Sequence, residues 1–118
     1  MSIKLVVAAL VPMLALATPA AAQDGTVAAR EIMGGAYAKA EQKLLAQMQT
    51  GARPDVQLNL AAVYYATGRT EQARALYHQV LAQADAPMTV VSNRFATSHA
   101  VATAGLHYLD KRQQTAAR

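Results

Sequence analysis

The sequence predicts an all-α protein made of antiparallel helical hairpins, with a small β-hairpin and a C-terminal capping helix near its end. Three observations support this fold class. Apolar residues recur at helical spacing in five segments. Glycine or proline separates several of these segments. Part of the pattern also repeats further along the chain, as Gly35 and Gly68 illustrate. Cysteine is absent, so packing alone must hold the helices together.

The N-terminal segment has the pattern of a cleaved signal peptide. Lys4 supplies a positive charge, an apolar run from Leu5 to Ala17 follows, and Ala20 and Ala22 form the small-x-small pattern of a cleavage site. The apolar run is shorter than the about 20 residues of a membrane-spanning helix. We therefore expect cleavage after Ala22, which removes residues 1–22 and leaves a periplasmic or secreted chain without a membrane span.

Composition argues against several classes of function. Eleven Lys and Arg against seven Asp and Glu leave a small positive excess, and these charges are scattered, whereas nucleic-acid binding normally needs a basic face. There is no Trp and Phe95 is the single Phe, so no aromatic platform for sugars or bases is expected. The residues after the predicted cleavage site suffice for one small domain.

Two helical hairpins are expected in residues 23–86. Gly34-Gly35 stops the first helix and Gly68 the third. Pro54 suits the first position of a helix, and Thr70 is a candidate N-cap. A short turn makes two helices antiparallel neighbours. The predicted helices are residues 27–33, 37–49, 55–66 and 71–83.

The interval from Gly35 to Gly68 is the repeat period of the sequence. A shift by this period superposes four pairs, three of them identical: Gly35 with Gly68, Ala40 with Ala73, Leu44 with Tyr77, and Pro54 with Pro87.

After Pro87 the period fails. β-branched residues on both sides of Ser92-Asn93 predict a β-hairpin at residues 87–97. A capping helix should follow at 98–112, with Thr97 or Ser98 at its N-cap, and the polar residues 113–118 are expected to be a flexible tail.

Residues 58–77 resemble a tetratricopeptide repeat. In that family a Leu and a small residue lie four and three positions before a Tyr, a Gly follows four positions later, an Ala five after that and an aromatic four further. These positions are filled here, in order, by Leu60, Ala61, Tyr64, Gly68, Ala73 and Tyr77. Small residues let two helices approach closely, and glycine accepts the turn. The sequence departs from the family at Gln57 and Thr70, where aromatics are usual, and at Asp85, where proline is.

The resemblance implies a short right-handed solenoid that binds another protein or peptide of the cell envelope. In the family the first helix of each repeat lines the concave surface. The corresponding residues here are Asp55, Leu58, Ala62, Tyr65 and Ala66. These residues lie on a face of the helix other than the one expected to join the core. Either a partner or the chain's own C-terminal segment should cover this face. The alternative is a self-associating structural protein, because solenoids usually need about three repeats to be stable.

No catalytic residue, cofactor site or metal site is predicted, so the chain is not expected to be an enzyme. His99 and His107 are eight residues apart, too far along one helix to share a zinc ion. Ser98 has no carboxylate pair or nucleophile turn beside it. His78 falls on a polar helix face, and Gly34-Gly35 lacks the strand and the third glycine of a phosphate-binding loop.

Overall fold

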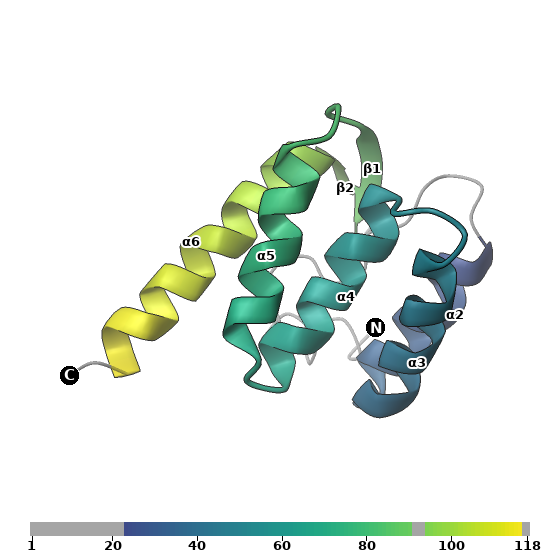
Figure 1. The fold of residues 1–118 in the computed structure, drawn as a ribbon, viewed down its shortest axis with the longest axis horizontal. Coiled ribbons are helices and arrows are strands. Elements are labelled where there is room, and N and C mark those ends of the chain that lie inside the picture. Colours follow the sequence, from purple (N-terminus) through teal and green to yellow (C-terminus); the bar gives the residue numbers. More distant parts are fainter. Residues whose placement is uncertain (1–22, 91–93, 117–118) are drawn as a thin grey trace.

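The computed structural model describes residues 23–90 and 94–116, and the predicted signal peptide lies outside these ranges. The described chain is mostly helical with one small antiparallel sheet, in agreement with the all-α class (Figure 1). The elements in order are α2 (Gln23–Met33), α3 (Tyr37–Met48), α4 (Pro54–Ala66), α5 (Thr70–Leu81), β1 (Pro87–Val90), β2 (Arg94–Thr97) and α6 (Ser98–Ala116). None of the helices in the described ranges is long and apolar enough to cross a membrane.

Several helix ends differ from the prediction: α3 ends at Met48 and α5 at Leu81, one and two residues early, and three other ends differ as follows. Helix α2 begins before residue 27. Helix α5 begins at Thr70 itself, and its N-cap is Arg69, which makes no side-chain capping bond. Helix α6 continues to Ala116, so residues 113–116 are helical and not a tail. No glycine or proline follows residue 112 to end α6. The predicted cap of α6 is confirmed, because Thr97 Oγ1 accepts a hydrogen bond from the Ala100 amide at 3.2 Å.

Two glycines make the same turn between paired helices. Gly35 and Gly68 have φ angles of 80° and 81°, a conformation that glycine adopts without steric cost. In each turn the following amide donates back to the preceding helix, from Ala36 to Glu31 O at 2.9 Å and from Arg69 to Tyr64 O at 2.8 Å. These bonds satisfy carbonyls at the helix C-terminus.

The helix bounds follow the repeat period of the sequence. Helix α4 ends one period after α2, and both ends of α5 lie one period after those of α3. The start of α6 lies further from the start of α4, and the difference equals the length of the segment 87–97, which contains the β-hairpin. The segment that contains the hairpin thus accounts for the whole of the added length between the starts of α4 and α6.

The helices lie side by side in a row from α2 and α3 at one end to α6 at the other (Figure 1). Each helix packs against the next, and α4 also contacts both α2 and α6. Every residue of α4 from Asp55 to Tyr64 is buried, as expected for a helix with neighbours on several sides. The core extends from Ile32 of α2 through α4 to Leu109 of α6.

Gln57 is a polar residue of α4 at a position where the tetratricopeptide repeats that the sequence resembles have an aromatic. It is 1% exposed, donates to Gln79 Oε1 at 3.1 Å and accepts from Gln83 Nε2 at 2.9 Å. Gln79 belongs to α5 and Gln83 follows its end, so the three amides join the two helices of this hairpin. A buried amide with its partners satisfied avoids the cost of an unpaired polar group.

The predicted β-hairpin is confirmed. Strands β1 and β2 pair antiparallel, with Pro87 opposite Thr97 and Val90 opposite Arg94. Met88 is buried, whereas Phe95 is 86% exposed. At the base of the hairpin the Ser98 amide donates to Ala86 O at 2.8 Å, which ties the start of α6 to the residue before β1.

Candidate functional site

The predicted partner-binding face of α4 is mostly inside the protein. Asp55, Leu58 and Ala62 are only 3%, 2% and 1% exposed, and the two apolar residues belong to the core. Asp55 accepts a hydrogen bond from Arg53 Nη2 at 3.2 Å. Of the two alternatives expected from the sequence, cover by a partner is therefore not met at these three positions, because α4 is the central helix and other parts of the chain bury them. Of the five predicted residues, Tyr65 and Ala66 alone are half-buried.

Tyr65 lies in a cleft between the C-terminal end of α4 and the last turns of α6. The cleft has a volume of about 470 Å³. It is lined by Tyr65, Tyr108, Lys111, Arg112, Thr115 and Ala116, and we call it the Tyr65 cleft. Residues 108, 111, 112 and 115 follow the spacing of one helix face. The cleft depends on the extension of α6 that the sequence analysis assigned to the tail, so the α6 side of this site was missed.

Arg112 is held in place by Tyr65. Its Nη1 donates to the Tyr65 carbonyl oxygen at 2.6 Å, and its Cζ lies 4.6 Å from the centroid of the Tyr65 ring. This is a cation–π arrangement, which stabilises by about 0.5–1 kcal/mol at exposed sites. The same carbonyl oxygen also accepts a hydrogen bond from the Gly68 amide at 3.3 Å in the turn after α4, so Arg112 adds a second donor at this helix end. Arg112 therefore both caps α4 and places a fixed positive charge in the cleft.

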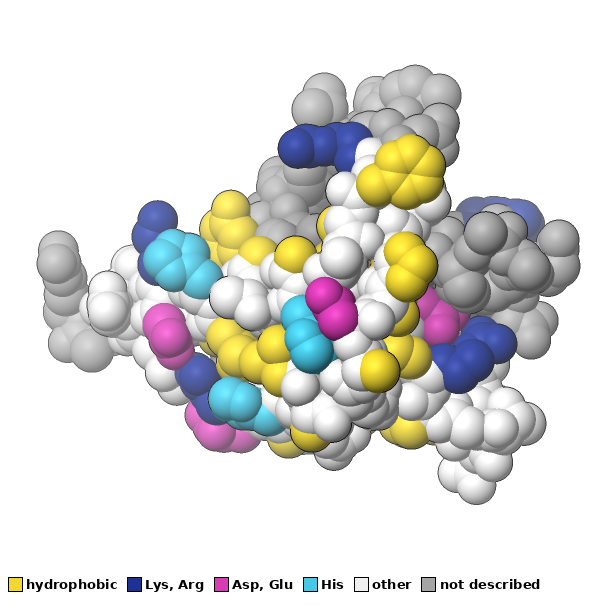
Figure 2. All heavy atoms as spheres, turned by 90° about the horizontal axis from the view of Figure 1, so that it is seen from above, with side chains coloured by type: hydrophobic (Ala, Val, Ile, Leu, Met, Phe, Trp, Pro, Cys, Tyr) yellow, Lys and Arg dark blue, Asp and Glu magenta, His cyan; other side chains and the backbone are white. Residues whose placement is uncertain are grey.

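The cleft is positively charged. Lys111 and Arg112 contribute two cations, and none of the lining residues within the described part of the chain is acidic. Asp110, the neighbouring carboxylate in sequence, pairs with Arg74 Nη1 of α5 at 3.0 Å. Lys111 makes no ion pair within the described residues. Elsewhere, on the face shown in Figure 2, Lys and Arg are dispersed among acidic and histidine side chains and form no basic stripe.

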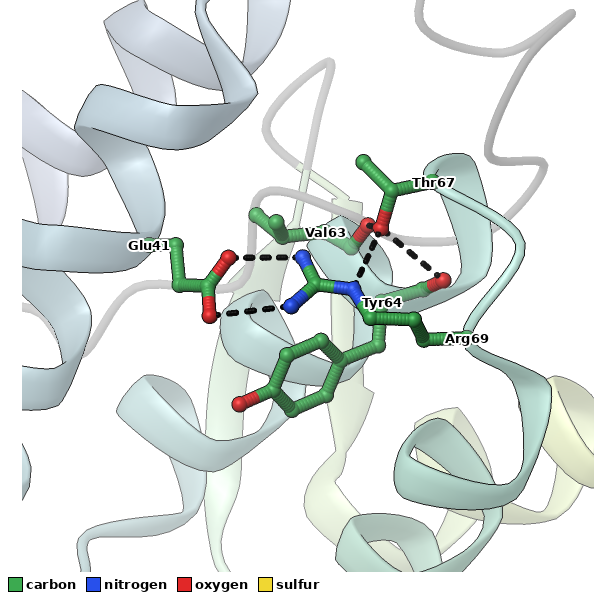
Figure 3. Close-up of polar contacts among 5 residues, drawn as sticks. All are labelled: Glu41, Val63, Tyr64, Thr67 and Arg69. Atoms are coloured by element: carbon green, nitrogen blue, oxygen red, sulfur yellow. Dashed lines mark hydrogen bonds and ion pairs between the residues drawn. The ribbon is translucent and has the colours of Figure 1, made fainter.

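A second Arg–Tyr arrangement joins α3 to the turn after α4 (Figure 3). Arg69 donates to both carboxylate oxygens of Glu41, at 3.0 and 2.6 Å, and its Cζ lies 4.5 Å from the Tyr64 ring centroid. Its Nε donates to Thr67 Oγ1 at 3.1 Å. The hydrogen bonds from Arg69 hold the pKa of Glu41 below its ordinary value. With both carboxylate oxygens occupied, this arrangement serves to join helices.

Ser98 and His99 form a structural junction. Ser98 is fully buried, and its Oγ accepts from the Ala86 amide at 3.0 Å and contacts Asp85 Oδ1 at 3.3 Å. The His99 amide donates to the same carboxylate at 2.9 Å. Nε2 of the His99 ring lies 2.7 Å from Gln83 O. The imidazole is thus engaged by a backbone carbonyl and not by the serine. This geometry differs from that of an activated serine, in which a base takes the hydroxyl proton.

The remaining histidines add no site. His78 and His107 are exposed, and the His107 ring meets the edge of Tyr108 with centroids 6.0 Å apart. Within residues 23–90 and 94–116, no three His, Asp or Glu side chains come together in a way that could hold a metal ion.

Comparison with known proteins leaves the fold and the site to be interpreted from the chain itself. The sequence matches no family model and no curated protein, and the structure matches no solved structure.

Proposed function

We propose that the chain is a tetratricopeptide-like helical-repeat module of the cell envelope that binds another protein or peptide in the Tyr65 cleft and catalyses no reaction. The observation that carries this proposal is the Tyr65 cleft. It lies where two non-consecutive helices, α4 and α6, meet. Its aromatic residue Tyr65 is one that the sequence resemblance assigns to a binding face. The envelope location follows from the signal-peptide pattern of residues 1–22, which lie outside the described residues.

The repetition of contacts supports the repeat architecture. Each first helix, α2, α4 and α6, packs against the next first helix as well as against the second helix between them, which is the nearest-neighbour order of a solenoid. The polar contacts repeat too. Arg69 bonds Glu41 at 3.0 Å, and Gln113 and Arg74, which occupy the corresponding positions one unit further along, also bond at 3.0 Å.

In this proposal α6 is the first helix of a third repeat. The small residue Ala61 and the aromatic Tyr64 of α4 have counterparts in Gly105 and Tyr108, which occupy the same places relative to the start of α6. Where α4 ends in the turn at Gly68, α6 has Arg112 and continues as a helix. The extra turns form one wall of the cleft, so the departure from the repeat creates the binding surface.

Photocrosslinking in intact cells tests the site. A crosslinking amino acid replaces Tyr108, which is 37% exposed, or as a control Leu45 of α3, which is 41% exposed. We expect crosslinks to a different envelope protein from position 108, absent from position 45 and lost when Tyr65→Ser is added. Equal labelling from both positions, or labelling that survives Tyr65→Ser, would contradict binding at the cleft.

The alternative of self-association is distinguished in the same experiment. Crosslinks from position 108 to a second copy of the chain, with a dimer mass in size exclusion with light scattering, would favour a self-associating structural protein. A monomer that crosslinks to another protein supports the interaction module.

A further inference from the structure

We infer that the occupant of the Tyr65 cleft is an acidic peptide segment of a partner protein, with carboxylate side chains on both sides of an aromatic or aliphatic residue. This inference rests on the proposed function and specifies the chemistry of the partner. It is carried by the charges of the cleft, the fixed position of Arg112 and the two tyrosine rings.

Electrostatic complementarity selects an anionic partner. Lys111 and Arg112 face no acidic lining residue among those the structure describes, and the carboxylate of Asp110 is engaged by Arg74. Two unneutralised positive charges near one opening attract carboxylates and disfavour cationic segments.

Arg112 is prepared to bind a carboxylate. One of its N–H groups bonds Tyr65 O and its guanidinium stacks on the Tyr65 ring. A guanidinium has five N–H donors, so several stay available. Because the side chain is already ordered, carboxylate binding costs less conformational entropy than it would for a free surface arginine. Lys111 adds a second, adaptable cation.

The tyrosines provide the apolar part of the site. Tyr108 is 37% exposed and Tyr65 is half-buried, and both line the cleft. Its volume of about 470 Å³ falls in the range of about 300–1,000 Å³ typical of pockets for small ligands, a size that suits a few side chains. One apolar side chain between the rings, with carboxylates directed to the two cations, fits this arrangement.

An anionic membrane fits less well. Recognition of anionic lipid surfaces by basic segments typically involves clusters of about 4–8 Lys or Arg, and the described residues of the cleft include two.

Binding of three labelled peptides to the purified full chain tests the inference. The first has four glutamates around one phenylalanine, and the other two have glutamine or lysine in place of every glutamate. We expect binding of the glutamate peptide, at least about tenfold weaker binding of the glutamine peptide and none of the lysine peptide. NMR shifts caused by the glutamate peptide should centre on Tyr65, Tyr108 and Thr115.

Charge reversal supplies the matched control. Lys111→Glu and Lys39→Glu change the net charge equally, and Lys39 lies on α3, away from the cleft lining. We expect Lys111→Glu to weaken glutamate-peptide binding about tenfold and Lys39→Glu to leave it nearly unchanged. The effect should shrink as the salt concentration rises from about 0.05 to 0.5 M. Both residues are exposed, so folding should be retained, which circular dichroism checks.

Three results would overturn the inference: equal binding of the glutamate and glutamine peptides, equal effects of the two charge reversals, or no peptide binding at millimolar concentration. Binding of phosphatidylglycerol vesicles that requires Lys111, without peptide binding, would overturn it in favour of a membrane. Crosslinking from position 108 does not depend on peptide charge. The proposed function therefore survives if crosslinks form while the acidic preference fails.

Discussion

Gly105 provides a sharp test of how α6 packs on α5. A Cβ atom at this position would lie 2.3, 2.5 and 2.7 Å from Cζ, Cε1 and Cε2 of Tyr77. Real Cβ atoms essentially never show such distances, so the ring or the helix must move. Tyr77 is 5% exposed, and burial raises the pKa of its hydroxyl. Its ring therefore has little free space into which it can turn.

The expected loss of stability in Gly105→Ala is the difference of two effects. Overpacking a well-packed core costs about 1–3 kcal/mol. Replacing glycine by alanine inside a helix favours the helix by about 1 kcal/mol. Because the clash involves three atoms of one buried ring, we place the overpacking in the upper half of its range. The net destabilisation is then about 1–2 kcal/mol, which lowers Tm by about 5–15 °C in a domain of this size.

Thermal unfolding followed by circular dichroism measures this shift, and Tyr77→Leu provides the control. In the preceding repeat the positions of Tyr77 and Gly105 correspond to Leu44 and Ala61, so the double variant recreates a pair that the chain already uses. Although Tyr77→Leu is destabilising alone, Gly105→Ala should cost much less in its presence. An unchanged or higher Tm for Gly105→Ala alone would show that helix propensity dominates and that α6 does not lie against the ring as described.

Three further outcomes test the turn, the core and the ion pair. Gly68→Ala should lower the free energy of unfolding, measured by chemical denaturation, by about 1–2 kcal/mol, because φ is 81°. The added Cβ meets no atom within 4 Å, so this cost comes from the backbone conformation, and Gly68→Asn should cost less. Leu58→Ala should cost about 2–5 kcal/mol, and a stability within error of the parent would contradict burial of that face. Glu41→Gln should lower Tm at pH 7 by an amount that shrinks toward pH 3. The bond from Arg69 lowers the pKa of Glu41 below 4.5, so its stabilisation is present above the unfolded-state pKa and is lost as the pH falls through the folded-state value.

The sequence was informative where local chemistry determines the backbone. The glycine turns, Pro54 at the first position of α4 and the β-hairpin were all predicted, because each depends on the conformational preference of a few adjacent residues. The sequence could not show that Leu58 and Ala62 are core. An apolar face looks the same whether another helix, the rest of the chain or a partner covers it.

The α6 side of the site was missed for two physical reasons. The polar residues after Arg112 suggested a frayed end, but contacts with distant residues, such as Gln113 with Arg74, favour continuation of the helix. The residues of the β-hairpin also lengthen the interval between α4 and α6, so the proposed correspondence of these two helices does not appear at the repeat period of the sequence. In the sequence, the relation between α4 and α6 is indicated by the equal spacing within the pairs Ala61/Tyr64 and Gly105/Tyr108. To find this match, an alignment must allow a gap of hairpin length, and the sequence by itself gives no ground for that gap.

The outer side of α6 bears on the choice between a binding module and a self-associating array. In α4, Val56, Asn59 and Val63 are buried. Their counterparts at the same places along α6 are Ala100, Thr103 and His107, and all three are exposed. A helix that packs against a further repeat is expected to bury these positions, as α4 does, whereas small and polar residues at exposed positions tolerate water. In the proposed repeat arrangement, these exposed small and polar residues disfavour end-to-end assembly through this face of α6. The Tyr65 cleft differs from this face, because it exposes Tyr108 beside two unneutralised cations. This difference favours a separate ligand over a second copy of the chain.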